Sequence, residues 1–227
     1  MNISKEAFEF VMNFYEEEAK KDYEALYRNA NNNDCNNYTL EKAICQWASD
    51  KAYRDVCRTI SFKETGESVE IQKSRMQKRI KVTNIIYDRI KQIDNYDTWH
   101  EATCNLIKDE YNDFISHKGT TTLYIGQVQK WLNMTLKWLW LYDATNPHDY
   151  FKAISEHKND LHIPLDSFII KYLKKEYNIN ISAPEWSRIK NYTEYFEYQK
   201  QLREKLTDIS PIEWELIHWK KALNYNK

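Results

Sequence analysis

Residues 126–142 read GQVQKWLNMTLKWLWLY, and this stretch decides the fold. Its second half is mostly apolar, which is typical of a helix at the centre of a domain. The polar residues Lys130, Asn133 and Lys137 follow one another at i, i+3 and i+7, so they share one helix face with Met134. Burying lysines in an apolar helix is unfavourable unless the charge has a use. The stretch therefore predicts a central helix with a functional face.

A second informative stretch, residues 162–173, reads HIPLDSFIIKYL. Proline favours the first turn of a helix, so Pro164 places Asp166 near the start of another apolar helix. His162 is expected to order the loop before this aspartate. A lysine near one helix start and an aspartate at another form a pair that a catalytic reaction can use.

The composition predicts an all-α protein. The 227 residues include only 3 glycines and 4 prolines, too few for the many tight turns of a β-rich chain of this length. We expect a single domain over residues 1–227, with two helical lobes around the central helix. Helical periodicity and capping residues predict helices over 4–28, 39–60, 69–93, 96–116, 126–142, 166–177, 184–206 and 211–224.

Several classes of protein are disfavoured. No apolar run reaches the ~20 residues needed to span a bilayer, and the N-terminus lacks the layout of a signal peptide. The cysteines at 35, 45, 57 and 104 are too far apart for a CxxC metal site and are expected to be reduced structural thiols. We therefore expect a cytoplasmic protein that binds no metal or cofactor.

The net charge of −1 hides an uneven distribution. Residues 1–50 carry five basic and ten acidic residues, whereas residues 51–91 carry eleven basic and five acidic ones. A local basic field attracts a polyanion even when the whole chain is almost uncharged. The cluster is equally typical of a solvated helix face. Its members proposed to bind DNA are Lys73, Arg75, Lys78 and Arg79.

The order of these features resembles the helix-hairpin-helix DNA glycosylase superfamily. The run Gly126-Gln-Val-Gln-Lys130 is similar to the glycine-containing hairpin and lysine of its lyase-competent members, with Val128 in place of the second glycine. The segment Ile163-Pro-Leu-Asp166-Ser is similar to the segment that carries their aspartate. No four-cysteine iron–sulfur loop follows Asp166, which excludes the endonuclease III type.

Within the superfamily, the chain most resembles the archaeal 8-oxoguanine DNA glycosylase branch. There a methionine follows the nucleophilic lysine by four residues and a second lysine by seven, as Met134 and Lys137 do here. The resemblance covers roughly residues 100–172, with weaker support from a C-terminal helix that carries Glu215 and Trp219.

The resemblance implies a monomeric DNA N-glycosylase and AP lyase that acts on double-stranded or single-stranded DNA. Lys130 would attack C1′ of a flipped nucleotide, and Asp166 would stabilise the cationic sugar and move protons. We expect burial and the positive end of the helix to disfavour the ammonium form of this lysine. Gly126, Gln127 and Gln129 would hold a backbone phosphate.

A flipped base needs a pocket with stacking and polar groups. The residues assigned to this pocket are Met134, Lys137, Asn133, Glu215, Trp219 and Trp214. Asn133 could equally satisfy a buried polar group, and Lys137 is the alternative nucleophile. The tryptophans of the central helix are more typical of core packing than of base stacking.

Interpretations without a catalytic role remain open for both Lys130 and Asp166. A lysine on a helix commonly extends its charge to the surface, and an aspartate at a helix start is commonly a cap. A non-catalytic helix-hairpin-helix module that binds nucleic acid or a protein would need neither side chain. A glycosylase for modified foreign DNA would need both. The sequence does not name the excised base or show whether strand cleavage follows.

Overall fold

The computed structural model describes residues 19–26, 28, 39–60, 68–112, 114–116, 119–179 and 185–224. Residues 19–26 are helical. The elements that follow are α2 (Leu40–Val56), the 3-10 helix η2 (Cys57–Thr59), α3 (Val69–Ile90), α4 (Tyr96–Glu110), β1 (Phe114–Ser116), β2 (Gly119–Thr121), α5 (Ile125–Thr145), α6 (Lys152–Glu156), α7 (Ser167–Tyr177), the 3-10 helix η3 (Trp186–Arg188), α8 (Tyr192–Lys205) and α9 (Pro211–Asn224). The predicted all-α class is confirmed, with one short β-hairpin added.

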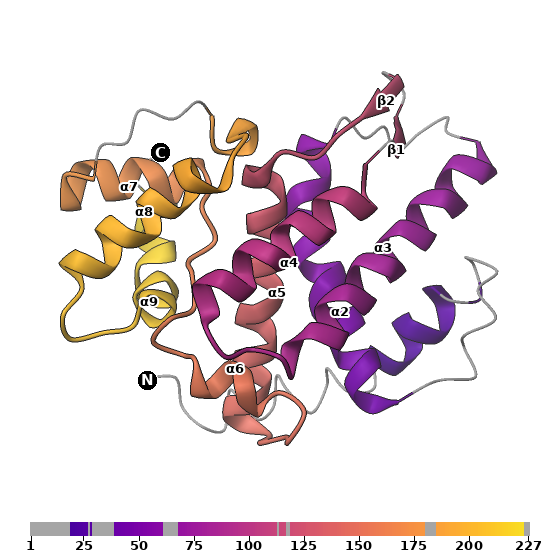
Figure 1. Ribbon diagram of the computed structural model, residues 1–227, viewed down its shortest axis with the longest axis horizontal. Helices are drawn as coiled ribbons and strands as arrows, with labels where there is room; N and C mark the ends of the chain where they lie inside the picture. Colours follow the sequence, from indigo (N-terminus) through magenta and orange to yellow (C-terminus); the bar gives the residue numbers. More distant parts are fainter. Residues whose placement is uncertain are drawn as a thin grey trace.

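Helix α5 lies at the centre of the molecule. Helices α2 and α3 lie on one side of it, α7, α8 and α9 lie on the other, and α4 crosses in front of it (Figure 1). Direct contacts to α5 come from α2, α4, α6, η3 and α8. A helix surrounded in this way must be apolar on most of its surface, as the sequence of α5 is.

The packing of α2 against α5 is organised by Trp131, which is fully buried. Its indole Nε1–H donates to the carbonyl and to the hydroxyl oxygen of Ser49 at 3.0 Å each. The ring of Tyr53 lies 4.9 Å from the Trp131 ring, between centroids. A buried indole needs a hydrogen-bond partner, so Ser49 makes this tryptophan compatible with the core.

Polar caps fix several helix starts. Side-chain oxygens accept hydrogen bonds from amides of the first helical turn, which otherwise lack partners. These caps are Thr39 of α2, Ser68 of α3, Asn95 of α4, Asp166 of α7 and Asn191 of α8. Helix α7 ends at Asn178, which has φ of 51° in the left-handed region that asparagine tolerates.

Two of the predicted helices need correction. The helix predicted over 96–116 ends at Glu110, and 114–116 form strand β1, which pairs antiparallel with β2 through Phe114 and Thr121. The helix predicted over 184–206 begins only at Tyr192, because the Asn191 side chain caps it there. Most of the helix predicted over 4–28 lies outside the described residues.

None of the helices in the described part of the chain is both long and apolar enough to cross a membrane.

Gly126 lies in the first turn of α5, where η3 packs against the helix. Its N–H donates to the Ile189 carbonyl at 3.0 Å. A Cβ at this position would lie 1.7 Å from the carbonyl oxygen of Trp186. This glycine is helical, and it is needed because the backbone of η3 occupies the place of a side chain.

We therefore expect Gly126→Ala to destabilise the protein by about 1–3 kcal/mol, since η3 must move to admit the methyl group. Urea denaturation at pH 7 measures this change. Asn105→Ala, at an exposed position of α4, is the matched control and should be almost silent. Equal stability of the two variants would contradict the close contact.

Candidate active site

A cavity of about 460 Å³ opens between α5, α7, α9 and the end of α2, a size typical of ligand sites. Six of its lining residues were expected from the sequence to serve a site: Lys130, Met134, Lys137, Asp166, Glu215 and Trp219. The cavity also has lining residues that sequence reasoning missed: Asp55, Arg58, Trp138, Leu141, Pro164, Phe168 and Leu216. Polar groups therefore converge on a largely apolar space.

Lys130 and Asp166 meet at the wall of this cavity. The Lys130 Nζ lies 3.2 Å from the Asp166 Oδ2, although 36 residues separate them in the chain. Both residues are 9% exposed. The ring of Trp186 lies beside them, with its centroid 4.8 Å from the same Nζ. The ammonium thus contacts a carboxylate and an aromatic face, two groups that attract a positive charge.

Asp166 uses its two oxygens for different purposes. Its Oδ1 accepts hydrogen bonds from the amides of Phe168 and Ile169 at 2.9 Å each, which caps α7. Its Oδ2 faces Lys130. The cap and the ion pair are therefore compatible, and the helix fixes the orientation of the carboxylate toward the lysine.

A second ion pair lies deeper along α5. The Lys137 Nζ donates to both carboxylate oxygens of Glu215, at 3.1 and 3.0 Å. Glu215 is 1% exposed, and this burial raises its pKa, an effect that Lys137 partly offsets. The cavity wall thus presents a hydrogen-bond donor and an acceptor side by side.

The segment before Asp166 is buried but not helical, so its backbone groups need other partners. Two glutamines supply them. Gln129 bonds both the N–H and the carbonyl of Leu165, at 3.2 and 3.0 Å. Gln199 bonds both groups of Ile163, at 3.1 and 2.9 Å. We call these two pairs of bonds the amide clamps. They tie the aspartate segment to α5 and α8.

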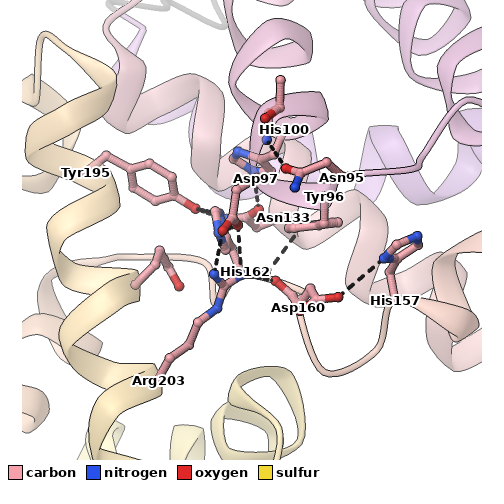
Figure 2. Close-up of polar contacts among 12 residues, drawn as sticks. Asn95, Tyr96, Asp97, His100, Asn133, His157, Asp160, His162, Tyr195 and Arg203 are labelled. Atoms are coloured by element: carbon pink, nitrogen blue, oxygen red, sulfur yellow. Dashed lines mark hydrogen bonds and ion pairs between the residues drawn. The ribbon is translucent and has the colours of Figure 1, made fainter.

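A network of polar side chains, buried at His162 and Tyr195 and half-buried at Asp97 and Arg203, holds the same segment from the other end (Figure 2). The His162 Nε2 lies 2.9 Å from the Asp97 Oδ1, and its Nδ1 lies 2.8 Å from the Tyr195 hydroxyl. Arg203 binds the Asp97 carboxylate through two nitrogens, at 2.8 and 2.9 Å. His162 therefore orders this loop, as the sequence predicted.

Asn133 joins this network to α5. It accepts from His100 Nε2 at 2.7 Å and donates to the Ile163 carbonyl at 3.1 Å and to the Tyr195 hydroxyl at 2.8 Å. Its place in the base pocket needs correction, because it does not line the cavity. The alternative, that it satisfies buried polar groups, is the one observed.

The surroundings of this network shift the pKa values of its side chains. Burial lowers the pKa of His162 to about 4, although its hydrogen bond with Asp97 opposes this. Burial and the nearby His162 also hold the pKa of His100 well below its usual value. Burial raises the pKa of Asp97, but hydrogen bonds from His162 and Arg203 lower it well below the usual range. The two imidazoles are therefore uncharged at pH 7.

The expected phosphate-binding residues at the start of α5 bond within the protein instead. The Gly126 amide donates to Ile189, as described above. Gln127 donates from Nε2 to the Thr59 carbonyl at 2.7 Å and accepts from the Tyr124 amide at 2.9 Å. Gln129 is fully buried in its clamp. These three residues position α5, η2 and η3 and leave little to offer a phosphate.

The basic cluster of α3 is also directed inward. Arg79 pairs with the buried Asp50, with 2.6 Å between Nη2 and Oδ1. Lys78 donates to the carbonyls of Glu110, the last residue of α4, and of Asn112 at 2.8 and 3.0 Å. Arg75 is 6% exposed. Neither these three nor Lys73 lines the cavity, and their contact with DNA stays a prediction.

Trp214 needs a similar correction. It is 1% exposed, donates from Nε1 to the Tyr177 hydroxyl at 2.6 Å, and stacks on His218 with ring centroids 4.9 Å apart. It packs α9 against α7 and does not line the cavity. Trp219, which is 42% exposed, is the tryptophan of this helix at the cavity.

Among the described residues, no group of three or more histidine, cysteine or acidic side chains is arranged to hold a metal ion. Cys45, Cys57 and Cys104 are free thiols. Comparisons with protein-family models, with curated proteins and with solved structures found no significant match. The chemistry of the cavity must therefore be derived from its own residues.

The buried histidines make stability depend on pH. Between pH 6.5 and 4 the unfolded chain binds a proton at His162 and the native protein does not, so we expect the free energy of unfolding to fall by up to roughly 3 kcal/mol on acidification through this window. His100 acts in the same direction. Urea midpoints at pH 7, 5.5 and 4.5 measure the slope. His162→Gln should flatten it, and an unchanged slope in that variant would contradict the assignment.

Proposed function

We propose that this chain is a DNA base-excision glycosylase with AP-lyase activity, of the helix-hairpin-helix type. Its substrate is a flipped nucleotide that carries an oxidised or otherwise modified base. The observation that carries the proposal is the contact of Lys130 Nζ with the Asp166 carboxylate at 3.2 Å on the wall of a cavity of about 460 Å³. An amine and a carboxylate at such a wall are the groups that covalent base excision requires.

The proposed reaction starts with proton transfer from Lys130 to Asp166, which frees the amine lone pair. The nitrogen then bonds to C1′ as the N-glycosidic bond breaks, and the base leaves with the electron pair of that bond and takes the proton held by Asp166. Asp166 is thereby ionised again, and its carboxylate stabilises the positive charge that remains on the nitrogen and the sugar. O4′ then leaves C1′ with the electron pair of that bond and takes a proton passed on from the nitrogen, which opens the sugar ring and gives the imine. The imine lowers the barrier to loss of a C2′ proton, after which the 3′ phosphate leaves with its bonding electrons.

The rest of the cavity suits a base better than a charged ligand. Met134, Trp138, Phe168 and Trp219 supply apolar and aromatic contact area. Lys137 and Glu215 supply a donor and an acceptor for the polar edge of the ring. A site built to bond such an edge rejects bases that lack it, because its buried polar groups would then be left unpaired.

A binding module without catalysis is the competing function. The ion pair of Lys130 and Asp166 argues against it. Enclosing a lysine and an aspartate is costly unless their charges are used, and surface binding of DNA needs neither at the wall of a cavity. The bidentate pairing of Lys137 with Glu215 likewise favours Lys130 over Lys137 as the nucleophile, because Lys137 is held by two hydrogen bonds.

Borohydride trapping tests the nucleophile. Wild-type protein is incubated with duplexes that carry an abasic site or one of a panel of modified bases, and the imine is reduced to a stable adduct. We expect an adduct with wild type and none with Lys130→Gln. Lys174→Gln, at an exposed position of α7, is the matched control and should react normally. Absence of any wild-type adduct would favour the binding module.

Asp166→Asn separates catalysis from capping. Asparagine is as good a helix cap as aspartate, so α7 should keep its start and the melting temperature should change little. Loss of the carboxylate should slow single-turnover base release about 100-fold or more. Single-turnover kinetics and thermal denaturation measure the two effects. A variant that is unstable but releases the base at the wild-type rate would leave Asp166 as a cap only.

A further inference from the structure

Trp186 has a place in the site that neither the sequence motifs nor the proposed reaction assigns. It belongs to η3, more than fifty residues beyond Lys130 in the chain, and it is not one of the cavity-lining residues. Its ring nevertheless lies 4.8 Å from the Lys130 Nζ, within the distance at which an aromatic face attracts a cation. We infer that Trp186 is a positioning residue, which holds the Lys130 amine at the cavity wall; this rests on the proposed function.

The backbone of η3 is fixed where this contact requires it. The Gly126 N–H donates to the Ile189 carbonyl, and the Trp186 carbonyl occupies the space of the missing Gly126 side chain. Ile189 is fully buried and anchors the end of the turn. The chain has only 3 glycines, and one of them stands at the point where η3 meets the helix of the nucleophile.

A positioning device is useful because a lysine side chain is long and flexible. Its four-carbon stem loses rotamer entropy when the amine is held in one place. Asp166 contacts the amine through one oxygen only, since the other caps α7. The Trp186 ring supplies a second, non-polar contact that does not compete for the carboxylate. With both in place, the resting ammonium is held at the cavity wall beside the carboxylate that takes its proton, so the amine is released in position to approach C1′.

The role of Trp186 is distinct from base binding. A residue that stacks on the flipped base should change the affinity for substrate. A residue that holds the nucleophile should change the rate of the bound complex and leave affinity unchanged. Trp186→Leu removes the aromatic face and keeps an apolar side chain, whereas Trp186→Phe keeps a smaller aromatic face. Comparison of these two variants separates the attraction of the aromatic face for the Lys130 ammonium from the effect of side-chain packing.

The experiment combines single-turnover adduct formation, duplex affinity and NMR of the Lys130 ε-methylene protons. We expect Trp186→Leu to slow adduct formation about tenfold at unchanged affinity, and Trp186→Phe to restore most of the rate. Ring current from Trp186 should shift the Lys130 ε-proton resonance upfield in wild type, and Trp186→Leu should abolish that shift.

Three outcomes overturn the assignment, and they are distinguishable. A wild-type adduct together with an unaffected Trp186→Leu rate overturns the positioning role alone. Equal loss of rate in the leucine and phenylalanine variants, with lowered stability in both, reduces Trp186 to packing. No wild-type adduct on any duplex overturns the lyase function and the positioning role with it, even if the upfield resonance is present.

Discussion

The buried, non-helical segment from Leu161 to Asp166 sets the constraint on which the rest of the site depends. Its backbone N–H and carbonyl groups cannot reach water and have no helix or sheet to pair with, so side chains must satisfy them. The amide clamps of Gln129 and Gln199 do so at Leu165 and Ile163. Because Gln129 immediately precedes Lys130, the same contacts that allow the segment to be buried also bring its aspartate to the lysine.

The histidine network extends this constraint to the other helices. Asn133 lies one turn beyond Gln129 on α5 and bonds His100 of α4, the Ile163 carbonyl and Tyr195 of α8. His162 and Arg203 meet at Asp97. Networks of this kind favour one arrangement of helices over others, because a shift breaks hydrogen bonds of buried polar groups. Rigid support is what a preorganised site needs.

The sequence predicted the parts that depend on local pattern. The apolar stretch predicted helix α5, the i, i+4 and i+7 spacing predicted that Lys130, Met134 and Lys137 share a face, and Pro164 predicted the start of α7 near Asp166. Tertiary packing decided the rest. Gln129 and Arg79 read as surface residues, but one bonds a buried loop and the other a buried aspartate. Trp186 lies in a short turn whose place is set by a backbone contact at Gly126, which leaves no periodic signal.

The pairing of charges around the cavity has a further consequence. Lys130 with Asp166 and Lys137 with Glu215 make its interior electroneutral, and Asp55 and Arg58 add one charge of each sign at its lining. An uncharged ring can enter this cavity without a counterion. A free anion would lose its hydration there and would gain no net electrostatic attraction. Under the proposed function, any dependence of binding on ionic strength would arise outside the cavity, and the interior would select its ligand by shape and hydrogen bonding.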